Sequence, residues 1–145
     1  MALSAAEIQN ARDAWEKFYA NVEDNGAAML ARMFSSYPDT KSYFKNFKLG
    51  SAAEMEGSAQ VRGHGKTVLG ALNNMVQHLD SMDALNGIIN PLAKKHATQL
   101  NVDLQYFDVL CNILLQVMEE KCGGNAKAAF AKVTSLVCNQ ISAAY

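Results

Sequence analysis

Three histidines are the residues of this sequence best suited to bind a metal or a ligand, and two of them lie in apolar surroundings. His64 shares one face of an expected helix with apolar residues at three- and four-residue steps, and so does His96. His78 lies among polar residues, so we expect it to be solvated. From the pattern alone, His64 and His96 are either hydrogen-bonded core histidines or ligands that face a cavity.

The surroundings of these histidines restrict the kind of metal site. The sequence has no HExxH and no CxxC motif, and no cluster of Asp or Glu lies near either histidine. A zinc or di-iron carboxylate site needs more protein ligands than this. One histidine beside a large apolar cavity would suffice if the metal brought four equatorial ligands, as iron does in a porphyrin. The seven methionines offer an alternative axial ligand, although methionine at helical spacing is more often core filler.

The elements that position these histidines are expected to be helices. Apolar residues recur at helical spacing almost throughout, no long stretch alternates like a strand, and only two prolines occur. The long helix that carries His64 is expected to begin near Ser58, and His96 to lie near the end of a helix that Pro91 opens. The pattern predicts an all-α chain with six or seven substantial helices, folded as one domain over residues 1–145.

Capping and breaking residues set several expected helix ends. Ser4 and Glu7 have the spacing of a capping box at the start of the first helix. Asp24-Asn25-Gly26 is expected to interrupt or bend the chain after it. Gly123-Gly124 is expected to end the long helix that precedes it.

Two glycines and two phenylalanines surround the first candidate histidine. Gly63 and Gly65 flank His64 in mid-helix, which predicts that something bulky lies close to that helix. Phe44 and Phe47 lie in an expected loop, where large aromatics are unusual unless the loop packs on something. They either close the edge of the core or contact a ligand.

Composition and charge exclude several classes of protein. Lys and Arg total 13 against 14 Asp and Glu, so no charge field predicts binding to nucleic acid or to an acidic membrane. The longest apolar-rich run, residues 109–118, contains Asn112 and Gln116 and is too short to span a bilayer. The first residues do not resemble a secretion signal. We therefore expect a cytoplasmic protein.

The three cysteines do not have the spacing of a disulfide framework or a zinc site. Cys111 and Cys138 lie in apolar helical settings and are interpreted as packing residues. Cys122 precedes a glycine pair at an expected exposed corner, so it is the one to test for reactivity, with inertness as the alternative.

The order and spacing of several residues along nearly the whole chain resemble the globin family. The matching positions are Trp15, Leu30, Tyr37-Pro38, Phe44, Phe47, the segments 64–69 and 91–98, and Tyr145. The resemblance implies a globin fold of six to eight helices in a three-over-three arrangement that encloses one haem b.

Within the family, the chain is similar to the vertebrate globins of the cytoglobin–myoglobin group, with minor members such as globin Y and globin E as alternatives. Segments such as Glu54-Met55-Glu56 are similar to cytoglobin, whereas Asp39-Thr40-Lys41 is more like myoglobin and haemoglobin. Val22 stands where cytoglobin has one of its paired cysteines, so the resemblance does not support a redox-linked disulfide of that kind.

The resemblance assigns a role to each of the two histidines. It implies that His96 is the proximal iron ligand, whose outer ring nitrogen donates to a backbone carbonyl near Leu92. It implies that His64 is the distal residue, which donates a hydrogen bond to bound dioxygen or occupies the sixth iron position itself. Leu30, Phe44 and Val68, with His64, would shape the ligand pocket.

The remaining haem contacts also follow from the resemblance. They would be Phe44, Phe47, Thr67, Leu92, Lys95, Val102, Phe107 and Leu110, with Lys45 and Asn46 as further candidates near the propionates. Leu100 stands where many globins carry a histidine, so that propionate contact is expected to be missing.

Three functions are compatible with a haem at this site. The first is reversible binding of dioxygen for storage or transport by a monomer or weak homodimer, with carbon monoxide and nitric oxide as further ligands. The second is a haem enzyme, active in nitric oxide dioxygenation, nitrite reduction or peroxidase-like chemistry. The third is a gas or redox sensor in which His64 ligates the iron. Fold-level resemblance alone does not choose among them.

Overall fold

The regular elements of the computed structural model are helices throughout the described residues, which are 3–44, 47, 50–100 and 102–145. In chain order they are α1 (Ala5–Tyr19), α2 (Val22–Ser36), the 3-10 helix η1 (Pro38–Phe44), α3 (Ala52–Gly57), α4 (Ala59–Val76), α5 (Met82–Lys94), the π-helical turn η2 (Lys95–Gln99), α6 (Gln105–Cys122) and α7 (Gly124–Ala144). The predicted all-α class is confirmed.

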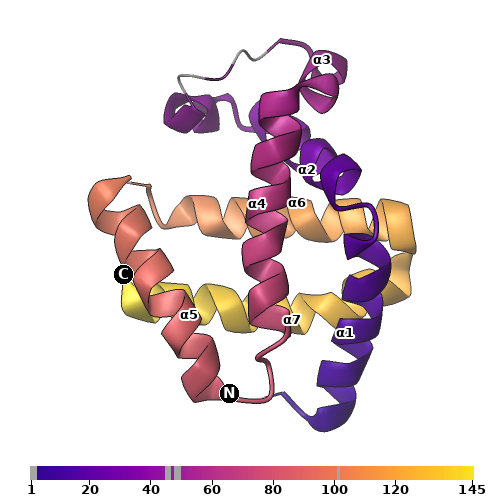
Figure 1. Cartoon of the computed structure of the whole chain (residues 1–145), viewed down its shortest axis with the longest axis vertical. Coiled ribbons are helices and arrows are strands. Elements are labelled where there is room, and N and C mark those ends of the chain that lie inside the picture. Colours follow the sequence, from indigo (N-terminus) through magenta and orange to yellow (C-terminus); the bar gives the residue numbers. More distant parts are fainter. Residues whose placement is uncertain (1–2, 45–46, 48–49, 101) are drawn as a thin grey trace.

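Six of these helices pack as two layers of three. Helices α1, α4 and α5 lie over α2, α6 and α7, and α4 crosses α6 and α7 steeply in Figure 1. Helices α6 and α7 pack side by side, and α7 also contacts α1 and α5. The apolar faces of α1, α2 and α7 meet in a common core, in which Trp15, Phe34 and Phe130 are almost completely buried. No described helix combines the length and the apolar character that a bilayer crossing requires.

The first helix begins as its capping residues predict. The Ser4 backbone N–H donates to Glu7 Oε1 at 2.9 Å, and the Glu7 N–H donates to Ser4 Oγ at 3.1 Å. Ser58 caps α4 through the Val61 N–H. Gly123 ends α6 with φ of 97°, a backbone conformation that favours glycine.

The prediction that Asp24-Asn25-Gly26 breaks the chain is wrong. Helix α2 already begins at Val22 and runs through all three residues. The buried Asn25 side chain donates from Nδ2 to the Phe18 carbonyl at 2.7 Å, so it satisfies an acceptor at the end of α1 instead of making a turn. The break between the two helices lies earlier in the chain, at Ala20 and Asn21.

The prediction that Pro91 opens the helix before His96 is also wrong, because Pro91 lies inside α5. Proline has no N–H to donate to the carbonyl of Gly87, one turn earlier. Both Pro91 and Gly87 are exposed, so water can satisfy that carbonyl and the helix can continue. After Lys94 the helix widens into η2, where the Leu100 N–H donates at 3.1 Å to the carbonyl of Lys95, five residues earlier. His96 therefore lies in a π-helical turn, a feature often found at functional sites.

Only one of the two glycines beside His64 has the close neighbour that the sequence predicts. That neighbour is helix α2: a Cβ on Gly65 would lie 2.5 Å from the carbonyl carbon of Gly26. Gly63 is exposed, and its Cβ would meet nothing within 4 Å. The small residue at position 65 therefore allows α2 and α4 to cross at backbone contact, which fixes where α4 places His64.

Candidate functional site: a cavity between two histidines

A cavity, partly open beside the exposed residues Thr67, Lys95 and Leu100, separates α4 from the turn that carries His96. It has a chamber of about 110 Å³ and a second of about 290 Å³, and both are lined by His64, Val68, His96, Phe107 and Leu110. Because the chambers share these walls, we treat them as one site. The exposed lining is mostly apolar in both chambers.

The apolar residues that share the His64 face of α4 are less buried beside the cavity than at the ends of that face. On α4, Val61 and Met75 are fully buried at the two ends of the stripe. Val68 and Leu72, between them, are only half-buried. Apolar side chains that point inward and yet remain half-buried are unusual in a close-packed protein. They mark a space that protein atoms alone do not fill.

His96 has the geometry of an oriented ligand. Its Nδ1 lies 2.7 Å from the Leu92 carbonyl oxygen, and a carbonyl can only accept, so Nδ1 carries the proton. In the neutral ring this bond leaves the lone pair of the other nitrogen, Nε2, free, and the ring lines both chambers of the cavity. The edge of Phe107 packs against the imidazole with ring centroids 5.3 Å apart. The ring is thus fixed in tautomer and in position.

His64 lies across the cavity in an aromatic setting. Its ring centroid is 4.9 Å from that of Phe44 and 5.7 Å from that of Phe47, both edge-on. Burial lowers the pKa of His64, and a positive charge on His96 would lower it further. His64 is therefore neutral near pH 7, and one ring nitrogen can donate a hydrogen bond into the cavity.

The structure brings the predicted site residues together. Leu30, Phe44, Val102, Phe107 and Leu110 line the smaller chamber, whereas Thr67, Leu92 and Lys95 line the larger one. Phe47 contacts the rings of Phe44 and His64. The candidates Lys45 and Asn46 lie outside the described residues.

Several cavity residues were not among the predicted haem contacts. They are Met33, Thr40, Tyr43, Tyr106, Ala71, Leu72, Met75, Leu100, Cys111, Leu114, Val137 and Ile141. Leu72 and Met75 share the helical face of His64, and Leu114, Val137 and Ile141 belong to apolar faces of their own helices, so helical spacing is a usable signal for these residues. No signal in the local sequence identifies Tyr43 and Tyr106, whose rings pack edge-on at 5.6 Å beside the smaller chamber.

The donor set fits a metal that brings most of its own ligands. Within the described part of the chain, no three His, Cys, Asp or Glu side chains gather where they could hold a bare metal ion. One oriented imidazole, a neutral imidazole opposite and an apolar wall are what iron in a porphyrin requires. Thr67 and Lys95 line the larger chamber, where their hydroxyl and ammonium groups can bind the acidic groups of such a cofactor. The residues present therefore fit a haem.

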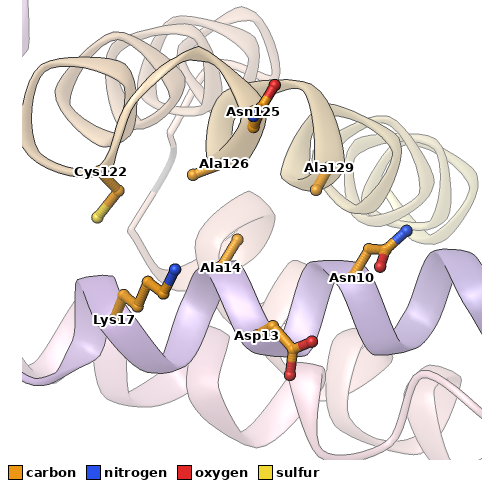
Figure 2. Close-up of a pocket in the computed structure, with 8 residues that line it drawn as sticks. All are labelled: Asn10, Asp13, Ala14, Lys17, Cys122, Asn125, Ala126 and Ala129. Carbon is orange, nitrogen blue, oxygen red and sulfur yellow. The ribbon is translucent and has the colours of Figure 1, made fainter.

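A larger hollow elsewhere lacks these features. A groove of about 480 Å³ lies between α1 and α7, with Asn10, Asp13 and Lys17 on one wall and Asn125 on the other (Figure 2). Cys122, from the end of α6, also borders this groove. The groove contains no histidine and is open to solvent, so its chemistry does not compete with that of the histidine cavity.

Comparisons with known proteins point to one family. The family model described as Globin matches residues 27–141, which include every residue that lines the cavity. Cytoglobin-1 of Oryzias latipes is 34% identical over 139 residues, which are 92% of this chain and 78% of the relative. Cytoglobin-1 of Danio rerio is 39% identical over 119 residues, 81% of this chain and 68% of the relative. Globin-2 of Mordacia mordax is 33% identical over 144 residues, 99% of this chain and 93% of the relative.

Proposed function

Because this chain belongs to the globin family, whose members bind haem and small gaseous ligands, we propose that it stores or transports dioxygen on a haem b held by His96. The observation that carries the proposal is the arrangement of the two imidazoles. His96 is held by the Leu92 carbonyl with Nε2 free, and a neutral His64 lies opposite it across an apolar cavity.

His96 is proposed as the proximal ligand. The haem supplies a ferrous iron that binds diatomic gases reversibly. The bond from Nδ1–H to the Leu92 carbonyl orients the ring and makes Nε2 a better donor to a metal. Phe107 prevents the ring from rotating, because its edge packs against the imidazole.

His64 is proposed to donate a hydrogen bond to the dioxygen ligand. A donor must carry its proton on the nitrogen that faces the ligand, and neutral imidazole has one such N–H. The low pKa of His64 keeps a second proton, and its charge, out of an apolar site. Phe44 and Phe47 hold the ring from one side.

The apolar wall is proposed to protect the ferrous state. Leu30, Val68 and Leu110 surround the space between the histidines and offer no hydrogen bonds to water. Water and protons that would promote oxidation are therefore disfavoured there. Thr67 and Lys95 at the larger chamber are proposed contacts of the propionates.

Dioxygen release from variants tests the role of His64. His64→Ala removes the proposed donor and should speed release by about 10- to 100-fold, since a hydrogen bond to a charged or strongly polar group contributes about 1.5–3 kcal/mol. Stopped-flow or flash photolysis measures this rate. The control is His78→Ala, because His78 bonds to the Asn74 carbonyl outside the cavity and should not affect release. An unchanged rate in His64→Ala would remove the proposed hydrogen bond.

The visible spectrum of the ferrous, ligand-free protein tests whether His64 waits beside the iron or binds it. A single broad band supports an open sixth position and the carrier function proposed here. Sharp, split bands that disappear in His64→Ala would indicate His64 ligation and favour a redox or sensor role.

The single domain over residues 1–145, the cytoplasmic location and the monomeric or weakly dimeric state are also proposals. Sedimentation velocity over a range of protein concentrations tests the last of these. A stable tetramer would contradict it.

A further inference from the structure

Two cysteines that are far apart in sequence meet at the wall of the histidine cavity. Cys111 on α6 and Cys138 on α7 are 27 positions apart, and their Sγ atoms lie 3.0 Å from each other. Both are free thiols. This distance exceeds the roughly 2.05 Å of a disulfide bond but brings the sulfurs into direct contact.

The surrounding helices hold the two thiols in place. Helices α6 and α7 pack side by side, and Leu114 and Val137, next to the pair, are buried in the core. Cys111 and Cys138 themselves are only half-buried. A small oxidant can therefore reach the pair, and a bond between the sulfurs needs only a small adjustment of the two side chains.

The surroundings of the two thiols shift their pKa values in opposite directions, which decides which thiol reacts first. The contact between them favours a proton on Cys111, which can donate to the Cys138 sulfur, so it raises the pKa of Cys111 and lowers that of Cys138. Burial and the nearby Asp108 carboxylate oppose the shift at Cys138. Cys138 is thus the thiol that attacks first, because the thiolate is the nucleophile.

The pair also contacts the wall that supports His96. Cys111 lines the larger chamber together with His96 and Phe107. The Cys138 thiol donates to the Phe107 carbonyl oxygen at 3.9 Å, and the Phe107 ring packs against the His96 imidazole with ring centroids 5.3 Å apart. A bond between the sulfurs would fix α6 to α7 one turn beyond Phe107.

We propose that Cys111 and Cys138 form a redox-active site that closes reversibly into a disulfide and thereby alters the His96 side of the haem cavity. The Cys138 thiolate attacks a small disulfide such as oxidised glutathione, which forms a mixed disulfide and releases one glutathione thiolate. Cys111, after losing its proton, then attacks the Cys138 sulfur and releases the second glutathione. Two thiols are oxidised, one glutathione disulfide is reduced to two thiols, and the two protein protons go to the released glutathione. The effect on ligand release rests on the proposed function, whereas disulfide formation does not.

The site differs from what the sequence suggests. From the sequence, Cys122 at the exposed corner is the one thiol to test for reactivity, with inertness as the alternative, and Cys111 and Cys138 are interpreted as packing residues. The structure places Cys122 beside the open groove between α1 and α7, away from the cavity that Cys111 lines. Cys122 therefore serves as an internal control.

Equilibration in glutathione redox buffers tests disulfide formation directly. The haem-loaded, carbon monoxide-saturated protein is held in buffers of increasing oxidised-to-reduced glutathione ratio, alkylated and analysed by peptide mass spectrometry. We expect Cys111 and Cys138 to lose alkylation together and to appear as one cross-linked peptide pair, while Cys122 stays alkylated. Oxidation should also raise Tm by on the order of 5–10 °C, since a loop of this length is closed. Full alkylation of all three thiols in the most oxidising buffer, a link to Cys122, or mixed disulfides with glutathione alone would overturn the proposal.

Dioxygen release from the reduced and oxidised forms tests the connection to His96. The rate should change by at least about fivefold on oxidation, the lower range of typical coupling between sites. Cys111→Ala and Cys138→Ala should each abolish this change, and Cys122→Ala should retain it. Equal rates in the two forms of the wild type would overturn the regulatory part. The peptide analysis is also repeated on haem-free protein. It detects the disulfide independently of dioxygen binding, so failure of the proposed function and failure of disulfide formation can be told apart.

Discussion

At the scale of single residues, the site depends on how two imidazoles are held. His96 follows Leu92 by four positions, the spacing at which a helical side chain can bond back to a backbone carbonyl. The family resemblance implies this bond, and the spacing of four positions is compatible with it. The aromatic packing around His64 could not be predicted in the same way, because it joins η1, the loop residue Phe47 and α4.

The lowered pKa of His64 predicts a pH dependence of stability. Because the folded-state pKa lies below that of the unfolded chain, the unfolded state binds more protons at mildly acidic pH. The stability associated with neutral His64 is fully present above about pH 6.5 and is lost as pH falls towards the lower folded-state pKa. Urea unfolding of haem-free protein between about pH 7.5 and about pH 5.5 measures this loss. His64→Gln, which does not titrate, should lose less stability over that range. Parallel curves for the two proteins would contradict the prediction.

At the scale of elements, helix contacts set the position of His64. Gly26 and Gly65 allow α2 and α4 to touch through their backbones, and the neighbouring His64 then faces the cavity. The sequence shows that a small residue stands at position 65. It does not show that the close neighbour is α2, because that depends on which helices cross.

The two glycines beside His64 should therefore respond oppositely to alanine. Gly65→Ala forces a methyl group against the Gly26 backbone and should destabilise the fold by about 1–3 kcal/mol. Gly63→Ala adds a methyl group in open space within a helix and should stabilise the fold by up to about 1 kcal/mol. Chemical unfolding of both variants gives these free energies. If the two substitutions had the same effect, backbone contact between α2 and α4 would not be what fixes the crossing.

Helix ends could be predicted where the determinants are local. The Ser4–Glu7 capping box and the end of α6 at Gly123 follow from neighbouring residues alone. The predictions failed at Asn25, whose buried side chain bonds to another helix, and at Pro91, where the carbonyl of Gly87 is exposed and can bond to water. In both cases the surroundings outweigh the local preference for a break.

At the scale of the whole molecule, the cavity is a product of packing. Its walls come from α2, η1, α4, α5, η2, α6 and α7, which are spread over most of the chain. Family resemblance identified His64, His96 and their apolar neighbours, since these recur at fixed positions. Tyr43, Tyr106 and the contact between Cys111 and Cys138 require the fold itself, because no pattern within one helix brings them together.

Haem binding by His96 variants tests the central claim, that this imidazole holds the iron across the cavity from His64. Haem-free wild type, His96→Gly and the control His78→Gly are titrated with haem and followed by Soret absorbance. Wild type and His78→Gly should saturate at one haem per chain. His96→Gly should bind haem much more weakly, and added imidazole should restore binding because it can occupy the space left by the deleted ring. Wild-type saturation and spectra in His96→Gly without imidazole would contradict the assignment of His96 as the iron ligand.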